Sequence, residues 1–179
     1  SNENWLWPEL SVTYDNSKLP QALIVAGKYL QNDGMVDMGM RSLKWLFSLQ
    51  TENDHFVPIG NDGWYKFGQN KARFDQQPLE AQSMLEGCLA AYQVNLDREW
   101  LRRAMTAFKW FLGHNDLNLP LYDAKTGGCR DGLQSTGVNE NQGAESSLAW
   151  LMALTELHIF RANEMLVPKI EQSALSSGS

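Results

Sequence analysis

The residues Leu43-Lys44-Trp45-Leu46-Phe47 are matched further along the chain by Phe108-Lys109-Trp110-Phe111-Leu112, with the Lys-Trp pair identical and apolar residues at the other three positions. A second pair of segments repeats at the same distance: Gln77-Pro78-Leu79-Glu80-Ala81 and Gln142-Gly143-Ala144-Glu145-Ser146. Two independent matches at one period indicate that a structural unit occurs twice. Because the matches lie in or beside segments with helical spacing, the repeat predicts stacked helical hairpins.

Apolar residues recur at every third or fourth position through much of the chain, which is the spacing of one helical face. Five segments show this period, and a sixth is interrupted by Pro168. The segments cover residues 19–30, 36–47, 81–92, 101–111 and 144–152, with the sixth at 162–170. We find no convincing strand pattern, so the sequence predicts an all-α fold.

The lengths of the connections predict how the helices are arranged. Short turns at 31–34 and 94–97 close two hairpins, whereas long connections at 51–77 and 115–141 join one hairpin to the next. The long connections and the entry segment, residues 5–18, are therefore expected at one rim. Loops of this length in a compact domain usually carry function. We expect an α/α toroid, or half of one, with functional loops on one rim.

The polarity of the helices predicts which of them face solvent. The second and fourth helices each have a polar side, carrying Arg41 and Lys44 in one and Arg102 and Lys109 in the other, as outer helices do. The helix at 144–152 is apolar nearly all round. We therefore expect inner and outer helices to alternate, with this last helix buried on several sides.

Composition excludes several classes of protein. The chain has 179 residues, 43% of them hydrophobic, and a net charge of −6. This predicts one domain over residues 1–172 followed by a disordered tail at 173–179. An acidic chain is a poor partner for nucleic acid, and no apolar run approaches the length of a membrane span. The two cysteines have neither zinc-site spacing nor the pattern of a disulfide framework, which favours a cytoplasmic setting and no metal site.

The expected rim combines aromatic rings, carboxylates, amides and two arginines. Sugars are recognised by this mixture, because flat rings cover the apolar faces of a pyranose while carboxylates and amides hydrogen-bond its hydroxyls. The predicted substrate-binding residues are Asp62, Trp64, Tyr65, Arg73, Gln77, Tyr122, Arg130 and Asn141. The predicted candidates for an acid or base are Asp75, Glu80, Asp131, Glu140 and Glu145.

Each of these residues also has a structural interpretation. Aspartates beside glycine, such as Asp62 and Asp131, stabilise turns, and Asp75 is placed to cap a helix. Glu80 and Glu145 occupy the same position of the repeat, where a carboxylate can also fasten a neighbouring loop. The two arginines can neutralise nearby carboxylates, and Trp64 and Tyr65 can pack within the loop. The sequence leaves both sets of roles open.

The sequence contains none of the common catalytic or cofactor motifs. It has no nucleophile elbow, no phosphate-binding glycine loop and no zinc-protease motif, so we expect no cofactor. An inverting glycoside hydrolase needs only two separated carboxylates, and that chemistry stays open. Glycosyl transfer by this segment alone is not expected, because the chain lacks the alternating strand and helix pattern of a nucleotide-sugar site.

Four blocks of the chain together resemble a bacterial helical domain of the six-hairpin glycosidase-like superfamily. The blocks are Asn61-Asp62-Gly63-Trp64, Arg73-Phe74-Asp75-Gln76-Gln77-Pro78, Gly127-Gly128-Cys129-Arg130-Asp131-Gly132 and Asn139-Glu140-Asn141-Gln142-Gly143-Ala144-Glu145-Ser146. The similarity runs over about residues 7–158. It implies a helical toroid associated with a glycosyltransferase module. The three histidines do not match the paired histidines of sugar 2-epimerase toroids.

The resemblance implies a carbohydrate-recognition or accessory domain of a glycosyltransferase-type protein, with a carbohydrate or glycoconjugate as its partner. The alternatives are an inverting glycoside hydrolase and a structural scaffold for assembly. A full ring needs about twice as many helices as this chain offers, so we expect half a toroid. Its open flank would be covered by a second copy or by a further domain.

Overall fold

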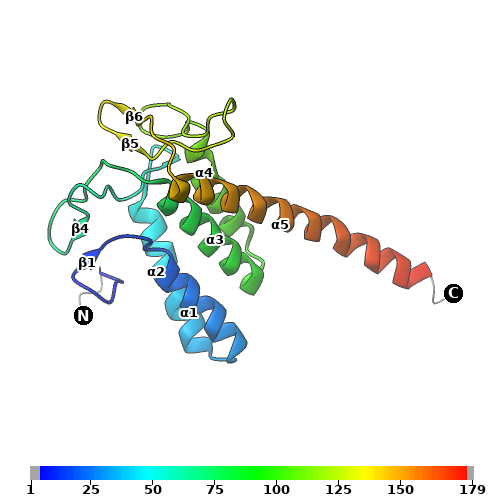
Figure 1. The fold of residues 1–179 in the computed structure, drawn as a ribbon. Helices are drawn as coiled ribbons and strands as arrows, with labels where there is room; N and C mark the ends of the chain where they lie inside the picture. The colour runs from blue at the N-terminus through cyan, green and yellow to red at the C-terminus, as the bar shows by residue number, and fades with distance from the viewer. Residues whose placement is uncertain (1–4, 177–179) are drawn as a thin grey trace.

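The computed structural model describes residues 5–176, which form five helices and six short strands (Figure 1). The helices are α1 (Lys18–Tyr29), α2 (Asp33–Leu49), α3 (Pro78–Asn95), α4 (Arg98–Phe111) and α5 (Ala144–Ser176). The strands are β1 (Ser11–Val12), β2 (Thr51–Glu52), β3 (His55–Phe56), β4 (Tyr65–Lys66), β5 (Gly132–Gln134) and β6 (Gly137–Asn139). The predicted helical segments at 19–30, 36–47, 81–92, 101–111 and 144–152 are confirmed as helices.

The helices pair as the repeat predicts. Helix α1 packs against α2, α3 packs against α4, and α3 also contacts α1 on one side and α5 on the other. The two tight turns have side-chain caps, because Asn32 Oδ1 accepts from Met35 N at 3.1 Å and Asp97 Oδ1 accepts from Glu99 N at 2.9 Å. Proline begins α3, where its missing N–H costs nothing. The connections between hairpins leave from one end of the helices, as expected (Figure 1).

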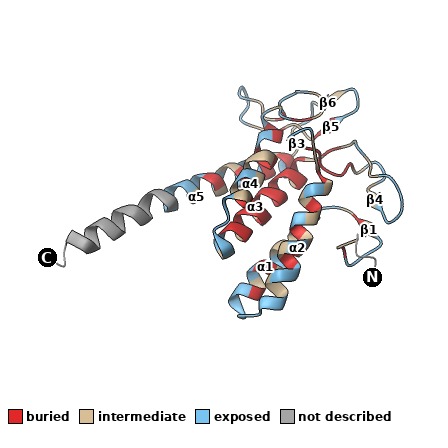
Figure 2. Ribbon diagram, turned by 180° about the vertical axis from the view of Figure 1, so that it is seen from behind, coloured by how far each residue is buried: buried red, intermediate tan, exposed pale blue. Residues whose placement is uncertain are grey.

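Helix α3 forms the centre of the protein and is buried along most of its length (Figure 2). Its neighbour α4 is amphipathic and turns Trp110 and Phe111 into the core, where both are fully buried. Trp150 of α5 stacks on Phe108 with ring centroids 5.4 Å apart. Cys88 of α3 is fully buried as well and belongs to the hydrophobic core.

The expectation of an all-α toroid is wrong. The structure contains three two-stranded antiparallel sheets beside its five helices, which makes it a mixed α/β fold. Strand β1 pairs with β4, β2 with β3, and β5 with β6. All three sheets lie at the rim, so the long connections are ordered by backbone pairing instead of running as plain loops.

The strands escaped detection because each has only two or three residues. An alternating pattern needs at least about four residues to be recognised. The signal that remained was in the turns: Asn53 and Asp54 join β2 to β3 with positive φ angles of 47° and 64°, as a tight hairpin turn requires. Ser135 and Thr136 join β5 to β6, also as a two-residue loop, but without positive φ angles.

Helix α5 differs from the expectation in its burial and its length. Ala149, Trp150, Ala153 and Leu157 face the core, whereas Leu148, Leu151, Met152 and Ile159 are exposed. Over residues 144–163, for which burial is described, the helix is thus buried on one side only. It continues to Ser176, so the segment 162–170 is part of it and not a separate helix. The predicted disordered tail therefore overlaps α5 at Ser173–Ser176, while residues 177–179 lie outside the described part.

We find no helix among the described residues that is both long enough and apolar enough to cross a membrane. The same part of the chain contains no cluster of three or more His, Cys, Asp or Glu side chains arranged to hold a metal ion. Cys88 and Cys129 are both buried free thiols, and burial raises the pKa of each.

Candidate functional site

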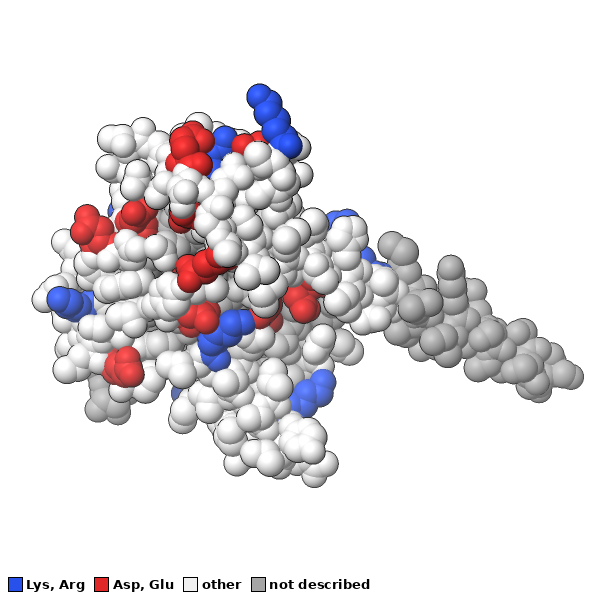
Figure 3. All heavy atoms as spheres, in the orientation of Figure 1, with Lys and Arg blue, Asp and Glu red and all other residues white. Residues whose placement is uncertain are grey.

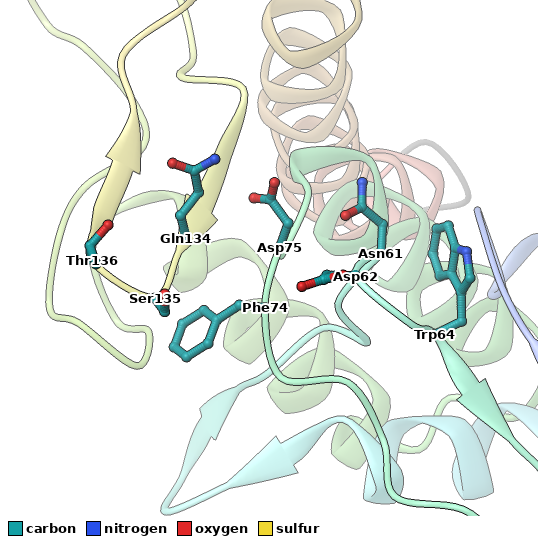
Figure 4. Close-up of a pocket in the computed structure, with 8 residues that line it drawn as sticks. All are labelled: Asn61, Asp62, Trp64, Phe74, Asp75, Gln134, Ser135 and Thr136. Carbon is teal, nitrogen blue, oxygen red and sulfur yellow. The ribbon is translucent and has the colours of Figure 1, made fainter.

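A cavity of about 600 Å³ opens at the rim, between the connection from α2 to α3 and the β5–β6 hairpin. Figure 4 shows its lining, in which the two walls face each other across Asp75. One wall carries Asn61, Asp62, Trp64, Phe74 and Asp75, and the other carries Gln134, Ser135 and Thr136. The lining therefore combines two carboxylates, two amides, two hydroxyls and two aromatic rings.

Backbone pairing within the α2–α3 connection brings Asp62 and Asp75 to the same cavity. Asn61 N donates to Asp75 O at 3.0 Å, and Gly60 N donates to Ala72 O at 2.8 Å. Gly60 packs so tightly that a Cβ atom built there would lie 2.0 Å from the Phe74 carbonyl oxygen. Only glycine allows this approach, so Gly60 determines how the two carboxylates are placed relative to each other.

The opposite wall is fastened to the start of α3. Gln76 N donates to Leu133 O at 3.0 Å and Leu133 N donates to Gln76 O at 2.8 Å, which joins β5 to the residue after Asp75. A Cβ atom at Gly132 would lie 3.0 Å from Asp75 Oδ1, so this carboxylate lies directly against the β5 backbone. The β5–β6 hairpin and Asp75 are thus fixed relative to each other.

Asp62 is exposed and Asp75 is half-buried. Among the described residues, neither carboxylate accepts a hydrogen bond or forms an ion pair. No lysine or arginine lines the cavity. Both carboxylates are therefore available to hydroxyl or amine groups of a ligand.

Trp64 also contacts Tyr14, which is bonded to Glu145 outside the cavity lining. The Tyr14 ring meets Trp64 edge to face with centroids 6.4 Å apart, and Tyr14 Oη donates to Glu145 Oε2 at 2.5 Å. Burial, this hydrogen bond and the negative charge of Glu145 raise the pKa of Tyr14. The predicted acid or base Glu145 is therefore bonded to a tyrosine beyond Trp64 and is not among the residues lining the cavity.

Glu80 fastens the entry segment to α3. Its carboxylate accepts from Asp15 N at 2.6 Å, from Asn16 Nδ2 at 2.6 Å and from Asn16 N at 3.4 Å. Asn16 Oδ1 accepts from Gln50 Nε2 at 3.0 Å, which continues the network to α2. Burial raises the Glu80 pKa to about 8, although the two backbone hydrogen bonds act to lower it. These contacts match the structural interpretation of Glu80.

Asp131 accepts hydrogen bonds at the start of α5. Its carboxylate accepts from Gly143 N at 2.7 Å and from the Asn141 side chain. Burial acts to raise the Asp131 pKa, but the hydrogen bonds from Gly143, Ser146 and Asn141 outweigh it and lower the pKa. Asp131 and Asn141 are thus bonded to each other, outside the cavity lining.

The remaining predicted residues lie around the cavity and do not line it. Arg130 Nε donates to the exposed Glu140 at 2.8 Å. Tyr122 stacks on Trp150 of the core at 4.5 Å. Tyr65 packs against Trp5 at 5.1 Å, away from its neighbour Trp64, and Gln77 takes the position before α3. Of the predicted site residues, the cavity therefore includes only Asp62, Trp64 and Asp75.

Arg73 belongs to a buried cluster around Asp116, a residue that the sequence did not single out. Asp116 Oδ1 accepts from Arg73 at 2.6 Å and lies 2.9 Å from His55 Nε2, while Oδ2 accepts from Gln76 Nε2 at 2.8 Å. Arg73 also donates to Glu52 at 2.8 Å. Burial acts to raise the Asp116 pKa, but the bonds from His55 and Arg73 outweigh it and lower the pKa.

The cavity residues missed from sequence are Asn61, Phe74, Gln134, Ser135 and Thr136. Asn61 and Phe74 adjoin the predicted Asp62 and Asp75, so adjacency was the available signal. The three polar residues at the tip of the β5–β6 hairpin gave no signal of their own, because a polar turn is an ordinary surface feature. Only the folding of this hairpin over Asp75 gives them a site to line.

Comparison with known proteins adds no relative: no protein-family model matches the chain, and no curated protein matches it. The family that the four sequence blocks resemble therefore stays a resemblance. The chemistry of the rim cavity and its surroundings is what supports a function.

Proposed function

We propose that this chain binds carbohydrate in the rim cavity, as the recognition or accessory domain of a glycosyltransferase-type protein. One observation carries the proposal: Trp64 and Phe74 line the same cavity as the unpaired carboxylates of Asp62 and Asp75. Aromatic faces pack against the C–H face of a pyranose, and carboxylates accept hydrogen bonds from neighbouring hydroxyls. The link to a glycosyltransferase rests on the resemblance of the four sequence blocks.

The size and openness of the site agree with a short saccharide. A cavity of about 600 Å³ lies within the ordinary range of small-ligand sites. The amides of Asn61 and Gln134 and the hydroxyls of Ser135 and Thr136 supply donors as well as acceptors. Donors and acceptors on both walls suit a ligand whose hydroxyls point in several directions.

Calorimetric titration against a panel of neutral mono- and oligosaccharides tests the proposal. We expect binding to the wild-type chain and a loss of about tenfold in affinity for Trp64→Ala, because ring stacking contributes about 1 kcal/mol or more. Tyr65→Ala is the matched control, since this adjacent ring packs on Trp5 and should leave affinity unchanged. Absence of binding across the panel, and to charged sugars as well, would overturn carbohydrate recognition.

Reducing-sugar release in the same samples tests the hydrolase alternative. An inverting hydrolase needs one carboxylic acid and one carboxylate in a single cavity, and Asp62 with Asp75 is the pair that the geometry brings together. Release that disappears in Asp62→Asn and Asp75→Asn, with binding retained, would make the domain an enzyme. Binding without release supports the accessory role.

Assembly is a second candidate function, and it rests on a different observation. Leu148, Leu151, Met152 and Ile159 form an exposed apolar stripe on α5, opposite the side that faces the core. Burial of this stripe by another copy or domain would remove its apolar surface from water. Sedimentation of the wild-type chain and of Leu151→Glu tests it: an oligomer that dissociates in the variant supports assembly, and a wild-type monomer excludes self-assembly.

A further inference from the structure

We infer that the rim cavity selects sugars carrying a free, protonated amine over neutral sugars, and that it excludes sugars carrying a carboxylate. The inference rests on the proposed function, because it concerns the ligand of the same cavity. It is drawn from the charge balance of the cavity walls and of the groups around them.

The cavity lining carries a negative charge that no lining residue balances. Asp62 and Asp75 both line it, and no lysine or arginine does. The other lining groups are neutral amides, hydroxyls and aromatic rings. A ligand entering the cavity therefore meets two negative charges without an opposing positive charge from the lining residues.

The lysines and arginine close in sequence to the cavity residues do not line the cavity. Arg73 precedes Phe74 in sequence, yet its guanidinium is held by Glu52 at 2.8 Å and by Asp116 at 2.6 Å. Lys71 donates to Leu49 O at 2.8 Å and lies 3.5 Å from Glu52. Lys66, two residues beyond Trp64, is exposed and is not part of the lining. These side chains do not neutralise the cavity carboxylates by direct contact.

Further acidic side chains lie outside the cavity walls. Glu145 is bonded to Tyr14 behind Trp64, and Asp131 lies at the start of α5 next to the β5 wall. Acidic side chains are spread over the rim half of this face, with some Lys and Arg side chains between them (Figure 3). The cavity lining itself carries charges of one sign, and such charges raise the local concentration of oppositely charged ligands. An ammonium group is favoured on these grounds, and the face of Trp64 adds a site for a cation against a ring.

The experiment compares three monosaccharides and their short oligomers at pH 6 and low salt: glucosamine, N-acetylglucosamine and glucuronate. We expect glucosamine to bind at least about fivefold more tightly than N-acetylglucosamine, and glucuronate to bind most weakly. Raising the salt concentration should reduce this preference, because ions screen open sites. N-acetylglucosamine keeps the ring and the other hydroxyls of glucosamine but has a neutral acetamide in place of the ammonium group, which makes it the uncharged comparison.

Charge-neutral variants assign the effect to the cavity. Asp62→Asn and Asp75→Asn should each weaken the binding of glucosamine more than that of N-acetylglucosamine, so that the preference for glucosamine falls several-fold. Glu140→Gln is the control, because Glu140 is another rim carboxylate but is 75% exposed, paired with Arg130 and outside the cavity. If an Asn variant fails to fold, the salt dependence of the wild-type preference still tests the inference.

The outcomes separate the two proposals. If N-acetylglucosamine binds and glucosamine binds no more tightly, the amine preference is wrong while carbohydrate recognition stands. The same conclusion follows if glucuronate binds as well as glucosamine, or if the preference survives in both Asn variants. If none of the three sugars binds, the preference and, with the neutral panel also silent, the proposed function are both overturned.

Discussion

Two acidic regions of the rim differ in how their carboxylates are used. Asp116 is 4% exposed at its side chain and contacts Arg73, His55 and Gln76. Asp62 and Asp75 face an open cavity and have no such partners among the described residues. The difference indicates that the first region holds the rim together, whereas the second leaves its charges to a ligand. Substitutions in the two regions should therefore act on different properties.

The largest effect is expected at Asp116. Asp116→Ala should lower the free energy of unfolding by about 2 kcal/mol, because it removes the hydrogen bonds that the buried carboxylate accepts from Arg73 and Gln76, although Arg73 keeps Glu52 and Gln76 keeps the Arg73 carbonyl as acceptors. Urea denaturation measures it, with Asp75→Ala as the matched carboxylate control. A loss below about 1 kcal/mol would show that the Asp116 cluster does not hold the rim together.

Glu80 should give a pH-dependent effect of intermediate size. Its folded pKa of about 8 lies above its ordinary value of 4.5, so the folded state holds a proton that the unfolded state loses as the pH rises. The stability from Glu80 is thus fully present below about pH 4.5 and declines as the pH increases through 8. Glu80→Gln, which cannot titrate, should lose this decline. Unfolding measured at pH 5, 6, 7 and 8 tests it, and parallel curves for wild type and variant would contradict it.

The cavity carboxylates should affect binding and not stability. Asp62→Asn and Asp75→Asn should change the free energy of unfolding by no more than about 0.5 kcal/mol, because both groups lack partners whose bonds would be lost. The affinity for glucosamine should fall in each variant. Thermal unfolding beside calorimetry measures both properties on one sample. A destabilisation as large as that of Asp116→Ala would show that Asp62 and Asp75 stabilise the fold.

The smallest effect is expected for Glu140→Gln. Its ion pair with Arg130 is solvent-exposed on the Glu140 side, and exposed pairs contribute little. Neither unfolding nor sugar affinity should change measurably. A clear loss of affinity in this variant would extend the binding surface beyond the cavity to the β6–α5 connection, and would weaken the contrast between the two regions.

The helical part of the fold was predictable because its signal is local and repeated. The stripes in α1 to α5 each span several turns, so the period of the apolar residues stands out from the background. The repeat predicted that Glu80 and Glu145 occupy equivalent positions. It did not predict that their roles differ. Glu80 is buried beneath Asp15 and Asn16, whereas Glu145 is exposed and bonded to Tyr14.

Adjacent residues show where sequence reasoning failed at the site. Trp64 and Tyr65 were predicted together, yet Trp64 lines the cavity and Tyr65 packs on Trp5. Trp64 ends the turn before β4 with a left-handed φ of 59°, whereas Tyr65 begins the strand, and this change of backbone conformation leaves no pattern in the sequence. Asp116 was overlooked because its partners come from two distant segments of the chain, at His55 and at residues 73–76.

The sequence by itself determined the helices, their pairing into hairpins and the placing of the long connections at one rim. Those features depend on contacts between residues close in the chain, and the spacing of apolar residues records them. Only the tertiary structure decided which carboxylates are buried in networks and which face the cavity. That division depends on the approach of Gly60 to Phe74 and on the β5–β6 hairpin beside Asp75. Such long-range contacts leave no local spacing in the chain.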